Sequence, residues 1–561
     1  MLRPRFNHLP LRRDGVRLVS PSAFQPPAEH ADQRDDEHHD WLLTDSQRGN
    51  PATRLRAWTH GNAVRPLVHG RPYFERLAEV VEETGRGDLV LFTDWRGDPG
   101  QKLRDDGLTV AQLFCEAAQR GVVVKGLIWR SHMDRLEFSH EQNRTLAEGV
   151  NEHGGEVLLD QRVRPFGSHH QKFVVVRHRD RPDDDVAFVG GLDLAHSRRD
   201  DADHHGDDQP QGFSHWYGET PAWHDVQVEI RGPGVRDVED VFRERWADRA
   251  ALSRLPWHAI PDLARRLDRS ADRLPPQRRD PPVAGSATVQ LLRTYPNRWP
   301  GYPFAPDGER SAARGYAKAM RRARRLVYLE DQYLWSAEVA EVFAEALRRE
   351  HDLHLVAVVP RYPDQDGRLA VAASRHGHAV ALERVQRAGG ERVLVLDVEN
   401  HANLPVYVHS KVCVVDDVWA TVGSDNFNRR SWTHDSELTA AIVDEARDER
   451  EPRDPGGLGD GARVFARDLR LTLLREHLDL TAADDDALLD PVTAVATIRR
   501  SAEALQAWHE SGREGPRPPG RLRPHDPDGV PRWRRLLAAP AYRTVADPDG
   551  RPPRMKVHRR H

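Results

Sequence analysis

Residues 408–431, VHSKVCVVDDVWATVGSDNFNRRS, contain the pattern from which the rest of the fold can be worked out. His409 and Lys411 lead into the apolar run VCVV, and a second apolar run, VWATV, ends at Gly423 and Ser424. Apolar runs of about four to eight residues between turn signals are typical of buried β-strands. Side chains two residues apart on a strand share a face, so we expect the imidazole of His409 and the ammonium of Lys411 to project together.

A similar stretch lies in the first half of the chain. There HHQKFVVV (169–176) carries His170 and Lys172 and is followed by DVAFVGGLDL (185–194). The flanking elements recur in the same order: first-half runs at 88–95, 121–129, 155–160 and 223–230 correspond to second-half runs at 325–335, 352–360, 392–397 and 435–444, with helical segments near 139–152 and 370–388. A repeat of this kind predicts two α/β domains whose mixed sheets are largely buried.

The segments between and around the repeats differ from them in composition. We divide the chain into a polar lead-in that is poorly ordered or loosely docked, a first repeat, a linker rich in proline and arginine, a second repeat and a mostly extended tail, at 1–54, 55–255, 256–285, 286–495 and 496–561. The first repeat carries an insertion, 195–222, which we expect to form a loop beside GGLDL. We interpret His38-His39 and His204-His205 as solvated loop residues, because no ligand spacing supports a metal site.

The composition excludes several classes of protein. No stretch approaches the ~20 apolar residues that span a bilayer, and the N-terminus lacks the apolar core of a secretory signal. The two cysteines, Cys115 and Cys413, lie in apolar elements and predict no disulfide framework, which favours a reducing cytosol. The net charge of -5, from 83 basic and 88 acidic residues, gives no overall signature of a nucleic-acid-binding protein.

Lysine is rare in this chain. Only six of the 83 basic residues are lysines, and two of them, Lys172 and Lys411, occupy the same place in the two repeats. A compact ammonium differs from a planar guanidinium, so a lysine that is kept in an arginine-rich chain is a hint of function.

The second motif, HSKVCVVD followed by GSDNFNRRS, resembles the His-x-Lys-x(4)-Asp signature of the phospholipase D superfamily with its Gly-Ser-x-Asn extension. The first, HHQKFVVV followed by AFVGGLDL, is similar to the N-terminal copy in the same superfamily, and YLEDQYLW and WHD resemble its flanking elements. The resemblance covers roughly residues 55–480. It implies two α/β sandwich domains packed about a pseudo-twofold axis, with one active site at the interface of the halves.

One position departs from the family pattern. The place of the motif's aspartate in the first copy holds Arg177. In the family that aspartate is a supporting residue, so its loss affects local geometry more than chemistry, and Asp183, Asp184 and Asp185 are candidates to compensate. We expect Arg177 to be peripheral to the site and Arg177→Asp to leave activity within about an order of magnitude.

The motif residues suit phosphodiester cleavage. That reaction needs a nucleophile, an acid for the leaving oxygen and positive charge around the non-bridging oxygens. Two facing histidines supply the first two functions, one by forming a phosphohistidine and the other as general acid and base. Lys172 and Lys411 are candidates to hold the phosphoryl oxygens, with help from Ser424 and Asn426. No metal or cofactor is expected.

A nucleophilic imidazole needs its second nitrogen held by a carboxylate. Asp225 in WHDVQVEI and Glu437 in DSELTAAI stand at equivalent places in the repeats and match the family's orienting acids. By analogy with the family we assign His170 as nucleophile with Asp225, and His409 as acid and base with Glu437. The sequence alone does not distinguish this from the reverse. We interpret Gly190-Gly191 as a turn that needs a positive φ.

The preferred function is hydrolysis of a glycerophospholipid to phosphatidic acid and head group, with transfer to an alcohol as a variant of the same chemistry. We expect a cytoplasmic monomer in transient contact with a membrane surface and without an obligate nucleic-acid partner. Three alternatives stay open: a phosphatidyltransferase of the cardiolipin-synthase kind, a nuclease, and a non-catalytic phosphate- or lipid-binding module. The net acidic charge argues against the nuclease, and the two intact His-x-Lys pairs argue against the binding module.

Overall fold

The computed structural model describes residues 40–131, 140–364 and 368–526, except for six positions between 254 and 269, and residues 539–558 except 541. Strands from both halves join into one 16-stranded sheet, which is long enough to curve round and face itself across a shared core.

The two halves of the sheet have the same strand order. From the centre outwards the first half runs β1-β8-β6-β5-β2-β3-β4 and the second runs β9-β17-β16-β15-β11-β12-β13. The halves join where β1 pairs with β9 in an antiparallel manner. The first-half strands are β1 (Thr59–Val68), β2 (Leu89–Asp94), β3 (Val123–Trp129), β4 (Glu156–Asp160), β5 (Phe173–Arg177), β6 (Val186–Gly190) and β8 (Val226–Arg231). The second-half strands are β9 (Ala287–Tyr295), β11 (Leu326–Asp331), β12 (His354–Val358), β13 (Val393–Val398), β15 (Lys411–Val415), β16 (Trp419–Gly423) and β17 (Glu437–Asp444).

Four further strands are only two or three residues long. β10 (Glu309–Arg310) pairs with β9, and β18 (Leu522–Pro524) adds to the edge at β13. β7 (Ala222–His224) and β14 (Val406–Val408) form a separate parallel pair that links the two halves. β7 ends directly before Asp225 and β14 directly before His409, so this pair fixes how these two residues meet.

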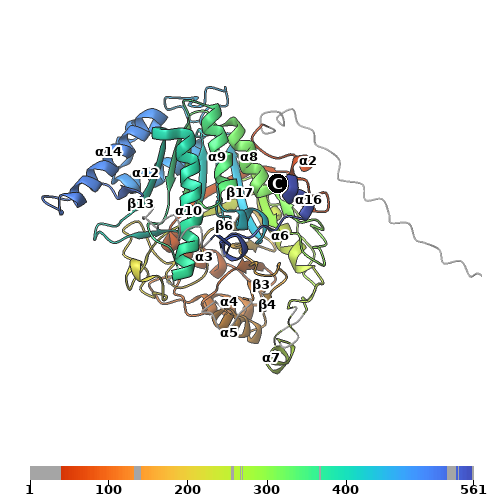
Figure 1. Ribbon diagram of the computed structural model, residues 1–561. Helices are drawn as coiled ribbons and strands as arrows, with labels where there is room; N and C mark the ends of the chain where they lie inside the picture. The colour runs from red at the N-terminus through yellow and green to blue at the C-terminus, as the bar shows by residue number, and fades with distance from the viewer. Residues whose placement is uncertain are drawn as a thin grey trace, which may run out of the picture.

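Alternation along the strands explains why both sheet faces are covered. In β5, Phe173 and Val175 point into the shared core, whereas Val174 and Val176 point to the outer face. α6 (Gly234–Trp246) and α12 (Val464–Leu478) contribute to the shared core. The outer faces carry α3 (Gly70–Glu82), α4 (Val110–Gln119) and α5 (His140–Glu152) on the first half, and α8 (Ser311–Arg322), α9 (Ala337–Arg349) and α10 (Arg368–Gly389) on the second. Figure 1 shows these two helix groups on opposite sides.

Local sequence signals set the limits of several helices. Thr109 and Gln112 form a capping box at the start of α4, and Asp490 caps α14 (Pro491–Glu510), which has proline at its first position. The remaining helices are α2 (Asp45–Arg48), α7 (Ala259–Ala264), α11 (Arg429–Thr433), α13 (Asp486–Leu489) and α16 (Pro553–His558), with 3₁₀ turns at Pro182–Asp184, His215–Tyr217, Gly390–Arg392 and Ala482–Asp484 and a π-helical turn at Tyr542–Ala546.

The predicted fold class is confirmed: the chain is a mixed α/β protein with a large, mostly buried sheet. Helices are present at 140–152 and 368–389, as expected from the sequence. Two predictions about the flanking segments are wrong. Trp41, Leu42 and Leu43 are buried against the second-half core, so the prediction for the lead-in fails at residues 40–54, while residues 1–39 lie outside the described residues. Residues 501–510 belong to α14 rather than to an extended tail. The proposed domain limits remain predictions.

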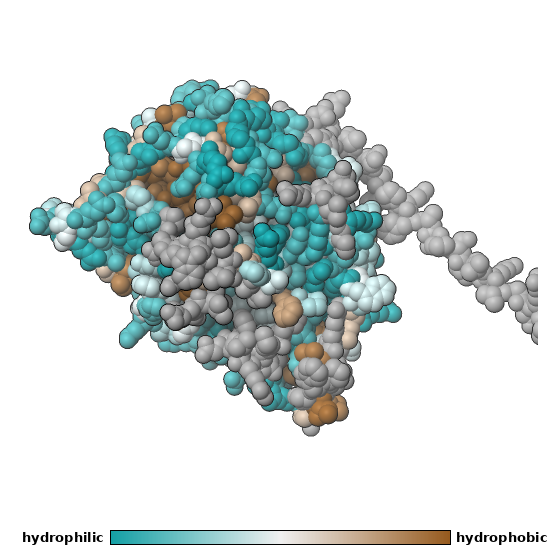
Figure 2. All heavy atoms as spheres, viewed as in Figure 1, coloured by the Kyte–Doolittle hydropathy of each residue, from teal (hydrophilic) through white to brown (hydrophobic). Residues whose placement is uncertain are grey.

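The surface is largely polar. The face seen in Figure 2 is mostly hydrophilic, with hydrophobic side chains at the tip formed by α7, where Ile260 and Leu263 are exposed. Among the described residues, no helix combines the length and apolarity needed to cross a bilayer.

Candidate active site

The two His-x-Lys motifs lie in extended segments that lead into β5 and β15. Each segment is anchored on the opposite half of the chain. The backbone N–H of His409 donates to the carbonyl of His224, at 2.7 Å, and that of His170 donates to the carbonyl of Ser436, at 3.0 Å. His224 stands directly before Asp225, and Ser436 stands directly before Glu437. The backbone therefore brings each histidine to the acid of the other repeat.

The side chains confirm this crossed arrangement. Nδ1 of His409 lies 2.6 Å from Oδ2 of Asp225, and Nδ1 of His170 lies 2.9 Å from Oε2 of Glu437. The predicted pairing of His170 with Asp225 and of His409 with Glu437 is therefore wrong. The analogy took each acid from the histidine's own repeat, but the parallel pair β7–β14 places His409 beside Asp225, and a parallel bridge between His169 and Ser436 places His170 beside Glu437. In both pairs the carboxylate uses Nδ1 of the histidine, so the other ring nitrogen, Nε2, is available to react with a substrate.

The acids do occupy equivalent places, as the sequence predicts. Gly190 pairs with Gln227 in the first repeat and Gly423 pairs with Thr439 in the second. Asp225 and Glu437 each stand two residues before that partner. Equivalent backbone positions thus carry both carboxylates.

The residue after each glycine supports the neighbouring acid. Ser424 Oγ donates to Glu437 Oε2 at 2.6 Å, so its proton is directed to the acid rather than to a bound phosphate. At the equivalent Gly191, a Cβ would lie 2.3 Å from Oδ1 of Asp225. Close approach of the acid, and not a positive φ, therefore requires glycine here, because neither Gly190 nor Gly191 has a positive φ. The predicted reason for this glycine pair is wrong.

Both lysines act on both histidines. Lys172 Nζ donates to the carbonyl of His170 at 2.9 Å, and Lys411 donates to the carbonyl of His409 and to Oε1 of Gln332, the latter at 3.3 Å. Burial lowers the pKa of His170 well below its usual value, and the charges of Lys172 and Lys411 lower it further. Burial and the same two lysines lower the pKa of His409. The two motifs therefore share one electrostatic environment.

The two acids are also shifted by burial. Burial raises the pKa of Glu437 to about 8, with a contribution from the charge of Asp435, and burial raises the pKa of Asp225. A raised pKa of the acid and a lowered pKa of the imidazole both favour a neutral pair, in which the acid keeps its proton and the imidazole is uncharged. Such a pair leaves the imidazole neutral and able to attack.

Several residues of this site were missed by the sequence reasoning. Arg198, on the insertion loop, is buried, lies over the ring of Trp223 at 4.0 Å and contributes to the lowered pKa of His409. Asp193, the first-repeat equivalent of Asn426, lies 3.6 Å from both Lys172 and Arg198. Its position inside the conspicuous GGLDL turn was the available signal. Asn426 itself is buried, and its Oδ1 has no hydrogen-bond partner among the described residues.

Arg177 is a buried structural residue. Its Nε lies 2.8 Å from Asp185, and its guanidinium also pairs with Glu239. Among the three candidates, Asp185 is thus the acid that accompanies it. In the second repeat, Asp416 accepts the backbone N–H groups of Arg324, Arg325 and Leu326, at 2.7–2.8 Å. Both positions therefore hold the sheet together at a distance from the imidazoles.

The histidine pairs predicted to be solvated have different outcomes. His204 is fully buried, which makes that prediction wrong, whereas His205 is exposed. His38 and His39 lie outside the described residues. His204 packs among His69, His224 and Glu476, which together could hold a metal ion.

Two family models match the chain. The model described as Phospholipase D matches residues 99–358, and the model described as Cardiolipin synthase, PLD-like domain, matches residues 316–450. The two matches cover the two His-x-Lys motifs in turn.

Curated relatives agree with these matches. Phospholipase D1 of Schizosaccharomyces pombe is 27% identical over 74% of this chain and 35% of its own length. Phospholipase D beta 1 of Arabidopsis thaliana is 26% identical over 78% of this chain and 51% of its own length. The chain thus spans about a third to a half of these relatives. Phosphatidylserine synthase of Haemophilus influenzae Rd KW20 superposes with a TM-score of 0.48 at 13% identity, covering 86% of this chain and all of that one.

Proposed function

Because this chain belongs to the phospholipase D superfamily, we propose that it is a phosphodiesterase that hydrolyses glycerophospholipids to phosphatidic acid and a free head group. One observation carries the proposal. His409 is hydrogen-bonded to Asp225 at 2.6 Å and His170 to Glu437 at 2.9 Å, so each imidazole meets the acid of the other repeat. Lys172 and Lys411, from different repeats, lower the pKa of both imidazoles. A single phosphate bound between them would therefore meet two imidazoles and two ammonium groups at once.

In the first step His170 acts as the nucleophile. Its Nδ1 proton is held by Glu437, which leaves the Nε2 lone pair to attack phosphorus. A P–N bond forms as the P–O bond to the head group breaks, and His409 gives its Nε2 proton to the leaving oxygen. The bound phosphodiester is negatively charged, so it raises the pKa of the buried imidazoles and allows His409 to carry that proton.

In the second step water enters. His409, now neutral and oriented by Asp225, takes a proton from the water, whose oxygen attacks phosphorus. The new P–O bond forms as the P–N bond breaks, which returns His170 to its starting state. An alcohol in place of water gives the transferred phosphatidyl-alcohol by the same steps. Lys172, Lys411 and Asn426 are assigned to hold the non-bridging oxygens, and Ser424 to position Glu437.

The lipid substrate is supported by the names of the relatives and by the net charge of -5, which is unfavourable for a long polyanion. We propose that the protein acts as a monomer, since one chain supplies both motifs, and touches the membrane surface only while bound to substrate. The free thiols Cys115 and Cys413 are consistent with a reducing cytosol.

A second candidate rests on the match of residues 316–450 to the cardiolipin-synthase-like family model. Such a phosphatidyltransferase would use the same residues with a lipid alcohol as acceptor. The test is an assay of the purified protein on a panel of phospholipids, with phosphatidylglycerol as acceptor in one arm and plasmid DNA in another. Phosphatidic acid from the lipids alone supports the proposal. Product only with the acceptor favours the transferase, cleavage of DNA alone favours a nuclease, and no turnover favours a binding module.

A further inference from the structure

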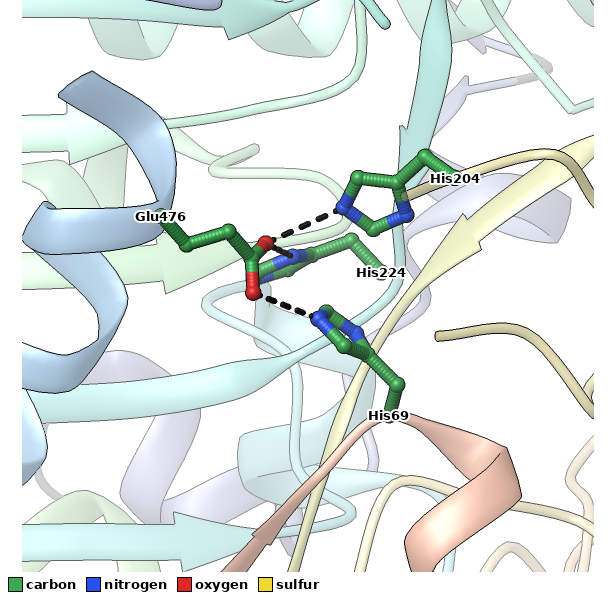
Figure 3. A group of neighbouring side chains, drawn as sticks. All are labelled: His69, His204, His224 and Glu476. Carbon is green, nitrogen blue, oxygen red and sulfur yellow. Dashed lines mark hydrogen bonds and ion pairs between the residues drawn. The ribbon is translucent and has the colours of Figure 1, made fainter. Parts of the chain in front are cut away.

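Three histidines and one glutamate from distant parts of the chain meet in the interior (Figure 3). His69 follows β1 and precedes α3, His204 lies in the insertion loop, His224 ends β7, and Glu476 lies in α12. The three histidines are 0–2% exposed. One ligand atom from each of the four residues lies within 4.8 Å of the others.

The nitrogen atoms point at one carboxylate. His69 Nε2 lies 2.7 Å from Glu476 Oε2, and His204 Nε2 and His224 Nδ1 lie 3.1 Å and 3.3 Å from Oε1. Figure 3 shows the three rings converging on Glu476 from different elements. Ligand atoms around a tetrahedral zinc ion, each about 2.0–2.1 Å from the metal, stand about 3.3 Å apart. The spacing of this cluster is thus close to that of a four-ligand zinc site.

Outer carboxylates hold two of the rings. His224 Nε2 lies 2.7 Å from Glu330, and His204 Nδ1 lies 3.5 Å from Asp200. A histidine that binds a metal through one nitrogen commonly donates its other N–H to a carboxylate, which fixes the tautomer and ring orientation. In both residues the nitrogen that remains is the one facing Glu476.

The backbone is shaped to deliver these side chains. His69 has a φ of 71° and His204 a φ of 56°, in the left-handed region that residues with a Cβ rarely adopt. Such strain persists where the surroundings over-determine it. Two of the three histidines are therefore held in conformations that the chain alone disfavours.

We propose that His69, His204, His224 and Glu476 form a closed, structural site for a divalent transition metal ion of the Zn²⁺ type. Three imidazole nitrogens and one carboxylate suit zinc and its neighbours, whereas Ca²⁺ and Mg²⁺ prefer oxygen ligands. All four positions are taken by protein atoms, so the ion has a structural function. This site is separate from the phosphoryl transfer proposed above.

A neighbouring group, His224, Glu330 and His477, also has ligand spacing. Glu330 already accepts from Tyr328, Ser410, His224 and His477 at 2.5–2.9 Å. Its oxygen lone pairs are therefore in use, and the group offers only three ligands. Glu330 fits better as the outer partner of His224.

The site would join elements of both repeats next to the catalytic residues. His224 accepts the backbone N–H of His409, and Asp225 follows it directly. Bound metal would fix β7 against α12 and the insertion loop, and so help to hold Asp225 beside His409.

The test is the metal content of the full-length protein, purified without chelator, together with its Tm. We expect about one equivalent of zinc per chain. Long dialysis against a chelator lowers the Tm, and adding Zn²⁺ or Co²⁺, but not Ca²⁺ or Mg²⁺, restores it. Bound Co²⁺ gives the intense visible absorption of a tetrahedral ion.

Single substitutions test whether the ion binds at these four residues. Glu476→Gln and His69→Ala are expected to lower metal affinity at least tenfold. His153→Ala removes an exposed histidine directly after α5 and is expected to keep about one equivalent of zinc per chain. Because a ligand variant can fail to fold, the chelated and reloaded native protein is measured in parallel. A native protein that contains no transition metal and gains no Tm from Zn²⁺ or Co²⁺ would overturn the proposal, as would full metal content in folded Glu476→Gln.

Discussion

His409 is oriented by Asp225, a carboxylate of the other repeat, through a hydrogen bond of 2.6 Å between Nδ1 and Oδ2. The same relation holds in reverse for His170 and Glu437, at 2.9 Å. Each repeat therefore contributes an incomplete catalytic pair, and a complete pair exists only when the halves pack together. This mutual dependence explains why one continuous sheet and one shared core join the halves.

The crossed pairing predicts which histidine responds to which acid. When His409 takes up a proton, Asp225 is the acid that can ionise beside the imidazolium; Asp225→Asn cannot, so the pKa of His409 falls while the titration of His170 is unchanged. NMR of isotope-labelled histidines measures both. We expect kcat to fall by about 10²–10⁴, since an amide at this place favours the wrong tautomer. The exposed Asp352→Asn is the control, and a shift at His170 instead of His409 would contradict the arrangement.

Glu437 predicts a pH-dependent stability. Burial raises its pKa to about 8 in the folded protein, whereas an unfolded glutamate titrates near about 4.3. Between these values the folded state holds a proton that the unfolded state has lost, so the contribution of Glu437 to stability falls as the pH rises. The neutral Glu437→Gln has no such loss, and its Tm relative to the native protein is expected to increase from pH 5 to pH 8.

Glu437 is bonded to His170 and Ser424 and interacts with the charges of Asp435, Lys172, Lys411, Asp425 and Arg430, all of which are unchanged in this variant. Thermal unfolding of both proteins at matched pH values gives the difference directly. A difference in Tm that is constant from pH 5 to pH 8 would mean that Glu437 is already ionised at pH 5.

Much of this site follows from the sequence, for a physical reason. His170, Lys172, His409 and Lys411 are local patterns on strands, and Asp225 and Glu437 are found by counting along equivalent strands. Their crossed pairing depends on how β7 lies beside β14, which no local pattern encodes. Close approach at Gly191 likewise depends on a strand that is distant in sequence.

The histidine cluster illustrates the same limit more strongly. His69 and Glu476 are 407 residues apart, and His204 lies in a polar insertion that resembles a solvated loop. Metal-ligand spacing can be recognised in sequence only when the ligands are close together along the chain. The polar composition of residues 195–222 led to the wrong expectation, because a loop full of charges can be buried when those charges are paired.

Substitution of Arg177 separates an effect on folding stability from an effect on turnover. Arg177→Asp removes the partner of Asp185 and Glu239 and adds a third buried acid, so we expect a loss of roughly 3–5 kcal/mol in the free energy of unfolding. The turnover of the molecules that remain folded stays within about tenfold. Denaturant titration and active-site-normalised rates separate the two effects. Arg181→Asp, at an exposed position, is the control, and loss of turnover in fully folded protein would place Arg177 in the site.

The burial of Lys411 predicts that another positively charged side chain cannot replace it in the reaction. It is 1% exposed and bonded to the carbonyl of His409 and to Gln332, so a planar guanidinium has no room there. We expect Lys411→Arg to lower kcat by about 10²–10³, the loss typical of one removed charge-stabilising donor. The exposed Lys102→Arg is the control. Activity equal to that of the native protein would show that a positive charge of any shape is enough.

The proposed phosphohistidine predicts transfer to alcohols. The second nucleophile enters after the head group has left, so a primary alcohol added to phosphatidylcholine and the protein is expected to yield the phosphatidyl-alcohol besides phosphatidic acid. His170→Ala and His409→Ala are each expected to abolish both products, because the two residues act as a unit, while His153→Ala keeps them.

A brief exposure to EDTA separates this chemistry from the metal site. The lysines supply the charge at phosphorus in the proposed steps, and the histidine cluster is buried, so initial rates are expected to stay unchanged during minutes of chelation even though prolonged dialysis lowers the Tm. Initial rates that fall at once on adding EDTA would mean that an accessible ion takes part in the reaction. Cleavage of plasmid DNA without lipid turnover would keep the phosphohistidine steps but assign them to a nuclease, because the same attack and proton transfers act on any phosphodiester that reaches His170.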